Sequence, residues 1–169
     1  MIGPPQWIVL AVALQRIVEA VYAGRNARRL LAAGGREFGR GHYPLFVLLH
    51  GGWLAAMFFM VPPDAPIDPV PIGVYVLLQI GRLWVIASLG RFWTTRIVTL
   101  PEAPLVKRGP YRFLHHPNYV IVAAELAVLP LAFGAWGIAL VASLLNLPLL
   151  WWRMRVEDTA LSARRALGP

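Results

Sequence analysis

Five stretches of the chain are apolar over nearly their whole length, and short segments rich in charge, glycine or proline separate them. They cover about residues 7–22, 45–61, 72–90 and 119–133, and a fifth follows the turn at 134–137 and ends near residue 152. Each approaches the ~20 residues that a helix needs to cross a bilayer. The last two are so tightly joined that we expect an antiparallel helical hairpin, and the amphipathic tail after residue 152 should continue the fifth helix. The pattern predicts an all-α polytopic membrane bundle of about five transmembrane helices, forming a single domain over residues 1–169.

The overall composition agrees with this class. Of the 169 residues, 58% are hydrophobic and only 14% are charged, and the mean hydropathy is +0.60. A soluble domain averages about 45–50% apolar and about 25% charged residues. Cysteine is absent, which excludes disulfides, thiolate metal sites and a cysteine nucleophile. The N-terminal MIGPPQW carries no basic leader, so we interpret the first apolar stretch as a retained span and not as a removed signal peptide.

The positive charges gather in alternate connections. Of the 16 Lys and Arg residues, five lie in 25–41, five in 91–116, four beyond residue 152 and two within spans. With five spans, all three basic segments fall on one side of the membrane, and the positive-inside rule makes that side cytoplasmic and places the N-terminus outside. This topology explains the net charge of +8 better than a nucleic-acid surface does, so we expect no nucleic-acid partner. The Ala- and Arg-rich composition suggests a bacterial source, and we expect the protein in the bacterial inner (cytoplasmic) membrane with its active site facing the cytoplasm.

Several charged or polar residues fall inside the predicted spans. Arg16 and Glu19 are three apart and share a helix face, so they can form a buried ion pair that fixes helix packing, or they can line a site. Charges at this depth are unfavourable unless they are paired or face a cavity. His50 within the second span, and His42 just before it, can likewise pack in the core or line a pocket. We expect no metal, because no third and fourth ligand lie at a useful spacing.

The densest group of reactive side chains lies between residues 105 and 125. Its basic first part is interrupted by Gly109 and Pro110, and it leads through HHPNY into the fourth apolar stretch. Pro117 suits the first turn of a helix, whose free N–H groups favour a carboxylate or a phosphate. Tyr111 and Tyr119 can stack on an aromatic ring or face a cation. The alternative is a basic loop that contacts anionic headgroups, with its tyrosines at the interface.

A second polar group follows the fifth stretch. Arg153 and Glu157 are four residues apart, with Arg155 and Asp158 beside them. They can form an exposed salt bridge worth a few tenths of a kcal/mol. Alternatively, Arg153 can hold an anionic substrate group while the neighbouring carboxylate orients it.

These two groups together resemble the isoprenylcysteine carboxyl methyltransferase family. The resemblance rests on GPYRFLHHPNY at 109–119, the apolar hairpin, and RxxxED at 153–158 with Leu161 after it. The upstream patterns QRxxE, RN, GHYP and RFWTTR are similar to a bacterial branch of that family, so the resemblance covers nearly the whole chain. Two positions depart from the family pattern: His115 replaces an arginine, and Arg96 falls where eukaryotic members have a cofactor-contacting glutamine.

The resemblance implies a membrane methyltransferase that uses S-adenosyl-L-methionine, with the cofactor and catalytic part at about residues 91–169. The residues that it assigns to the cofactor are Pro104, Leu105, Val106, Tyr111, His116, Pro117, Asn118 and Tyr119. It assigns Arg153 and Glu157 to the substrate as the catalytic pair.

The expected acceptor is lipophilic, either a prenylated carboxylate or a small lipid with a phenol or pyrone hydroxyl, and membrane lipids are expected to surround the chain. Three alternatives stay open at this point. They are a phospholipid amine N-methyltransferase, an NADPH-dependent membrane reductase of the sterol-reductase type, and a lipid-binding scaffold without enzymatic activity.

Overall fold

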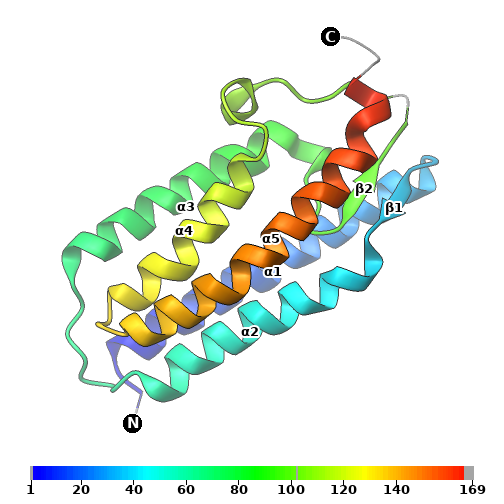
Figure 1. Cartoon of the computed structure of the whole chain (residues 1–169). Helices are drawn as coiled ribbons and strands as arrows, with labels where there is room; N and C mark the ends of the chain where they lie inside the picture. Colours follow the sequence, from blue (N-terminus) through cyan, green and yellow to red (C-terminus); the bar gives the residue numbers. More distant parts are fainter. Residues whose placement is uncertain (1, 102, 166–169) are drawn as a thin grey trace.

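The computed structural model describes residues 2–101 and 103–165, and five helices dominate it (Figure 1). They are α1 (Pro4–Ala32), α2 (Tyr43–Met60), α3 (Pro69–Leu89), α4 (Pro117–Leu131) and α5 (Trp136–Arg165). Four of these segments are long and apolar enough to cross a membrane, whereas α4 is a shorter apolar helix of 15 residues. The prediction of an all-α polytopic membrane bundle is confirmed.

The helix boundaries follow from local sequence signals. A proline occupies the first turn of every helix from α1 to α4, where its missing N–H leaves no intrahelical bond unmade. Asp68 caps α3 by accepting a hydrogen bond from the Val70 N–H at 2.9 Å. The expectation that α1 gives way to a loop at Arg25 is wrong, because α1 continues to Ala32. Ala, Leu and Arg in this extension are strong helix formers, and the helix stops only before Gly34, whose φ is +89°.

The core is formed where α4 and α5, the yellow and orange helices of Figure 1, pack against each other and against α2 and α3. Its buried apolar residues include Trp53, Met57, Leu126, Leu129 and Phe133. The outer faces are also apolar: Leu48 is 70% exposed and Phe59 is 81% exposed. A soluble protein rarely leaves so much apolar surface uncovered, whereas a bilayer covers it. The chain is therefore an integral membrane protein.

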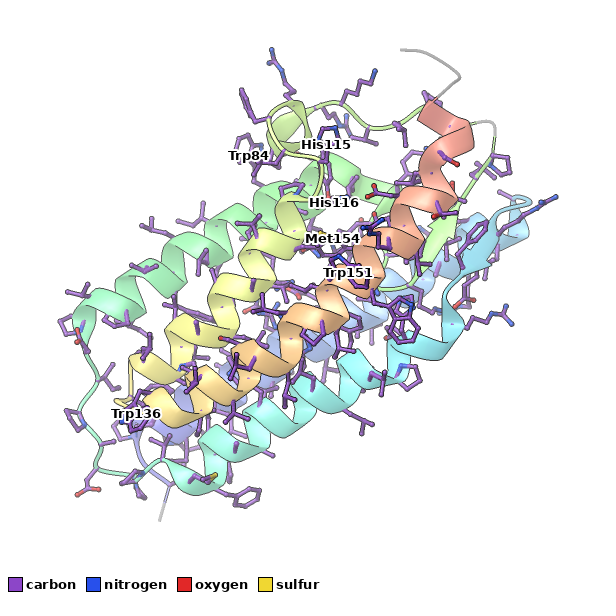
Figure 2. The ribbon with its side chains drawn as sticks, viewed as in Figure 1. Trp84, His115, His116, Trp136, Trp151 and Met154 are labelled. Carbon is purple, nitrogen blue, oxygen red and sulfur yellow. The ribbon has the colours of Figure 1, made fainter. Side chains whose placement is uncertain are left out.

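All the basic connections lie at one end of the bundle. Strands β1 (Arg36–Phe38) and β2 (Ile97–Thr99) pair antiparallel there, beside the short helical turns η1 (Arg40–His42), η2 (Gly90–Phe92) and η3 (Gly109–Arg112). The small sheet was not predicted. The last turns of α5 reach the same end, which confirms the helical tail as far as Arg165, and residues 166–169 lie outside the described residues. The α4–α5 turn lies at the opposite end, where Figure 2 shows Trp136 far from His115 and His116.

A cluster of polar side chains crosses the middle of the bundle, and we call it the membrane ion cluster. It consists of Gln15, Arg16 and Glu19 of α1, Gln79 and Arg82 of α3, and Glu125 of α4. Arg16 binds Glu19 at 2.9 Å and Glu125 at 2.9 Å. Arg82 donates its Nε–H to Glu125 at 3.0 Å and lies 3.3 Å from Glu19. Two positive and two negative charges thus balance, and they tie α1 and α3 to α4.

Candidate functional site

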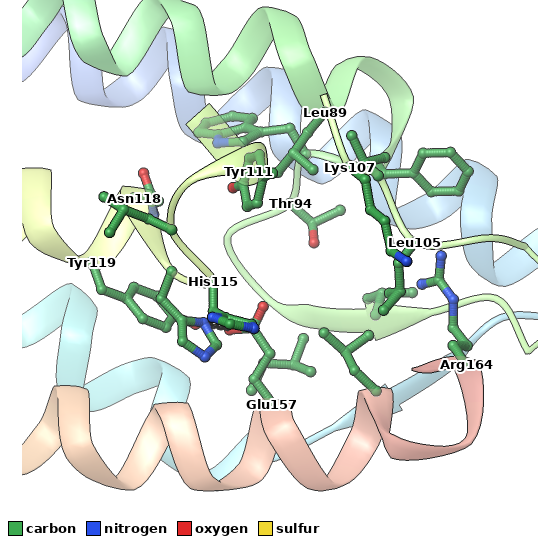
Figure 3. Close-up of a pocket in the computed structure, with 18 of the residues that line it drawn as sticks. Leu89, Thr94, Leu105, Lys107, Tyr111, His115, Asn118, Tyr119, Glu157 and Arg164 are labelled. Carbon is green, nitrogen blue, oxygen red and sulfur yellow. Dashed lines mark hydrogen bonds and ion pairs between the residues drawn. The ribbon is translucent and has the colours of Figure 1, made fainter. Parts of the chain in front are cut away.

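A cavity of about 560 Å³ opens at the basic end of the bundle, as the close-up in Figure 3 shows. Its wall includes seven segments of the chain: the end of α3, η2, β2, residues 105–107, η3, the start of α4 and the end of α5. Small-molecule sites in proteins have volumes of about 300–1,000 Å³. The cavity is therefore large enough for a nucleoside-sized ligand.

The η3 turn brings Tyr111 into this cavity. Gly109 adopts φ +59° and packs so closely on α3 that an added Cβ would lie 2.0 Å from the Ser88 Oγ. Next to it, the Arg108 Nε–H donates to the Ser88 carbonyl at 2.8 Å, which satisfies an acceptor at the end of α3. Burial raises the pKa of the Tyr111 phenol, and the nearby Glu157 charge adds to the effect. Tyr111 is therefore a neutral hydroxyl at physiological pH.

The first turn of α4 supplies three more polar side chains. The rings of His116 and Tyr119 stack with centroids 5.2 Å apart and an interplanar angle of 13°. The His116 Nε2 lies 3.2 Å from an Asp158 carboxylate oxygen on α5. The Asn118 Oδ1 is buried in the cavity wall and has no hydrogen-bond partner within the described part of the chain. A buried acceptor without a partner is unfavourable, so this oxygen is suited to an N–H or O–H group of a ligand.

Tyr119 connects the two polar groups that stand far apart in the sequence. Its hydroxyl donates a hydrogen bond to the Glu157 carboxylate and accepts one from the Arg153 Nε–H at 2.9 Å. Arg153 also donates to the Thr95 carbonyl at 2.8 Å, and its guanidinium lies over the Phe46 ring at 5.3 Å. Arg153 is only 8% exposed. The alternative of an exposed Arg153–Glu157 salt bridge is therefore wrong, because Arg153 is buried and the tyrosine hydroxyl joins the two side chains.

The structure brings most of the sequence-predicted site residues to one cavity. Those that line it are Leu105, Val106, Tyr111, His116, Asn118, Tyr119, Arg153 and Glu157. Pro104 and Pro117 do not line it: the Pro104 carbonyl accepts a hydrogen bond from Arg164 at 2.8 Å, and Pro117 is buried at the start of α4. The residues expected for the cofactor and those expected for the acceptor line the same cavity.

The two histidines that could have lined a pocket lie elsewhere. His42 is 1% exposed, and its ring lies 5.4 Å from that of Trp152. The His50 Nδ1 lies 2.8 Å from the Phe46 carbonyl, within α2 itself. Arg164, by contrast, lines the cavity and was not identified from the sequence. Its spacing to Arg153, Glu157 and Leu161 places all four on one face of α5, which is the signal that could have found it.

Comparison with known proteins gives the family. A model of the isoprenylcysteine carboxyl methyltransferase (ICMT) family matches residues 71–163, more than half of the chain and a range that contains every predicted site residue. The chain belongs to this family. ICMT-family proteins are membrane methyltransferases that use S-adenosylmethionine, so the protein is a membrane methyltransferase of the ICMT type.

Two bacterial relatives match more of the chain than the family model does. "Uncharacterized protein YpbQ" of Bacillus subtilis is 33% identical over 165 residues, covering 92% of this chain and 95% of the relative. An "Uncharacterized protein" of Haemophilus influenzae is 29% identical over 143 residues, covering 82% of this chain and 83% of the relative. No solved structure matches the chain. The Bacillus subtilis relative matches nearly the whole of this chain, so the similarity extends N-terminal to the residues that the family model matches.

Proposed function

We propose that this protein transfers a methyl group from S-adenosyl-L-methionine to an oxygen of a lipophilic acceptor, a carboxylate or a phenol or pyrone hydroxyl. The observation that carries the proposal is the Arg153–Tyr119–Glu157 chain of hydrogen bonds in the wall of the cavity. By the distribution of Lys and Arg, the cavity faces the cytoplasm of a bacterial cell, where the water-soluble cofactor is available.

The residues of the cavity fit such a cofactor. The unpartnered Asn118 Oδ1 suits one of its N–H groups, and the neutral Tyr111 offers a hydroxyl and an aromatic face to a sulfonium. Leu105 and Val106 give an apolar surface against which the carbon skeleton of the cofactor can pack. When bound, the cofactor supplies an electrophilic methyl group on sulfur. The residues of this chain bind and align the two reactants.

Arg153 and Glu157 are suited to the acceptor. Two of the five guanidinium N–H groups of Arg153 donate to Tyr119 and Thr95, which fixes its orientation and leaves others for an anionic oxygen. Glu157 holds the Tyr119 hydroxyl, and with a hydroxyl acceptor it can take up the proton that the acceptor loses. A buried guanidinium repels a protonated amine. An oxygen acceptor is therefore favoured over a phospholipid amine.

The acceptor assignment is tested with Arg153→Ala, and Arg155→Ala serves as the matched control because Arg155 is exposed on the same helix. Methyl transfer from labelled S-adenosylmethionine to long-chain phenols and pyrones is measured beside the affinity for S-adenosylhomocysteine. We expect Arg153→Ala to slow transfer about 100-fold or more with little change in that affinity, and Arg155→Ala to leave both unchanged. Methyl transfer at the normal rate by Arg153→Ala, with cofactor binding unchanged, would show that the assignment is wrong. Binding of NADPH instead of S-adenosylhomocysteine would favour a reductase.

A further inference from the structure

Arg164 lies near the end of α5, and its side chain is buried in the wall of the cavity. It is 6% exposed, and it lies one residue beyond the family match, which ends at 163. In Figure 3 its guanidinium lies next to Leu105, at the opposite end of the pocket from Tyr119. Arg153 lies at the Tyr119 end, because its Nε–H donates to the Tyr119 hydroxyl, so the cavity has a cation at each end.

Within residues 2–101 and 103–165, the hydrogen bonds of Arg164 all go to neutral acceptors. Its Nε–H donates to the Ala103 carbonyl at 2.6 Å, Nη1 to the Thr99 hydroxyl at 3.1 Å, and Nη2 to the Pro104 carbonyl at 2.8 Å. No carboxylate of residues 2–101 or 103–165 forms a salt bridge with it. Arg96, another cavity cation, has Glu37 at 3.4 Å. Arg164 therefore carries a buried positive charge that no described anion balances.

A buried charge without a counter-ion costs several kcal/mol, so a position of this kind indicates an anionic ligand. A guanidinium has five N–H donors, and three of those of Arg164 already hold it in a fixed orientation. The remaining N–H groups can donate to a carboxylate with little further ordering. Burial lowers the pKa of this guanidinium, which agrees with the absence of a counter-ion among the described residues, and arginine nevertheless stays charged at physiological pH.

The start of α4, where the sequence favours an anion, offers few free N–H groups. Pro117 has no N–H, and the Tyr119 N–H already donates to the His116 carbonyl at 3.1 Å. Arg164 is seven residues beyond Glu157 on the same helix, or about 10 Å along its axis. This separation leaves the Glu157 end of the cavity for the reacting groups and the Arg164 end for a charged tail.

We propose that Arg164 binds the carboxylate of the amino-acid part of S-adenosylmethionine. This inference rests on the proposed function and adds to it the residue that recognises the anionic end of the cofactor. In this proposal the hydrogen bonds to the Ala103 and Pro104 carbonyls hold the guanidinium in the orientation that binds the carboxylate.

The test compares two ligands by calorimetry on the full-length protein in detergent. They are S-adenosylhomocysteine and its decarboxylated analogue, which lacks only the carboxylate. We expect the wild type to prefer S-adenosylhomocysteine about 10- to 100-fold, the range for a hydrogen bond between charged groups. Arg164→Gln should abolish this preference while changing the affinity for the analogue less than about threefold. Arg155→Gln, an exposed control on the same helix, should keep the preference.

The other outcomes are distinguishable. If Arg164→Gln lowers the affinity for both ligands equally, Arg164 only holds α5 against the 103–104 segment, and the inference is wrong. If the wild type binds both ligands with the same affinity, the inference is also wrong although the proposed function stands. If the wild type binds neither ligand, the proposed function itself is contradicted, and the inference with it. Should Arg164→Gln fail to fold, Arg164→Lys keeps the charge and should retain only part of the preference.

Discussion

The membrane ion cluster allows a quantitative prediction about Glu125. Its carboxylate is 1% exposed and accepts hydrogen bonds from Gln79 at 2.7 Å, from Arg16 at 2.9 Å and from Arg82. Glu125→Gln preserves the shape of the side chain but removes its charge. The cluster then changes from two positive and two negative charges to a net charge of +1 in a medium that solvates charge poorly.

Removing one partner of a buried ion pair costs about 3–5 kcal/mol. The glutamine oxygen can still accept one of the present hydrogen bonds, so we expect a loss of about 3 kcal/mol, at the lower end of that range. For a protein of this length, 1 kcal/mol corresponds to about 2–4 °C in Tm, so Tm should fall by about 6–12 °C.

The assay is thermal unfolding of the purified protein in a mild detergent. Asp68→Asn is the control, because Asp68 is an exposed cap of α3 and asparagine caps as well as aspartate does. The double variant Arg16→Gln with Glu125→Gln restores the balance of charges and should recover at least about 1 kcal/mol relative to the sum of the two single effects. An unchanged Tm for Glu125→Gln, or strictly additive losses in the double variant, would refute this explanation of the cluster.

Two further predictions concern the cavity wall. Gly109→Ala places a Cβ 2.0 Å from the Ser88 Oγ at a position with φ +59°. It should therefore displace Tyr111 and weaken the binding of S-adenosylhomocysteine about tenfold or more. The control Gly73→Ala, whose added Cβ meets no neighbour within 4 Å, should leave this binding unchanged. Because burial raises the pKa of Tyr111, the unfolded chain loses its proton first as the pH rises past about 10, and stability should fall there. Tyr111→Phe should remove that part of the fall in melts recorded from pH 9 to 11, and an identical slope in the two proteins would contradict this.

The bundle itself could be predicted because a bilayer imposes a strong signal on the sequence. Each apolar stretch became a helix, and Pro117 marks the start of α4 as expected. The end of α1 was placed too early because hydropathy falls at Arg25 although helix propensity does not. The β1–β2 pair could not be foreseen, because each strand has only three residues and its partner lies about 60 residues away.

The residues of the site could be predicted from the sequence, but their arrangement in space could not. Tyr111, Tyr119, Arg153 and Glu157 stand out by residue type and spacing, and all four line the cavity. That Tyr119 lies between Arg153 and Glu157 depends on how α4 packs against α5, which no local pattern specifies. In sequence, Arg164 looks like one more basic residue of the tail. Only its burial and its neutral hydrogen-bond partners distinguish it from a solvent-exposed charge.

The central claim is methyl transfer from S-adenosylmethionine to a lipophilic oxygen acceptor. The most direct measurement incubates the purified protein and S-adenosylmethionine labelled in its methyl group with a lipid extract of the source organism, and then identifies the labelled product by mass spectrometry. The proposal predicts a labelled methyl ester or methyl ether in the organic phase, which disappears with Arg153→Ala. Failure of every lipophilic compound to acquire label, or label found only on an amine nitrogen, would contradict it.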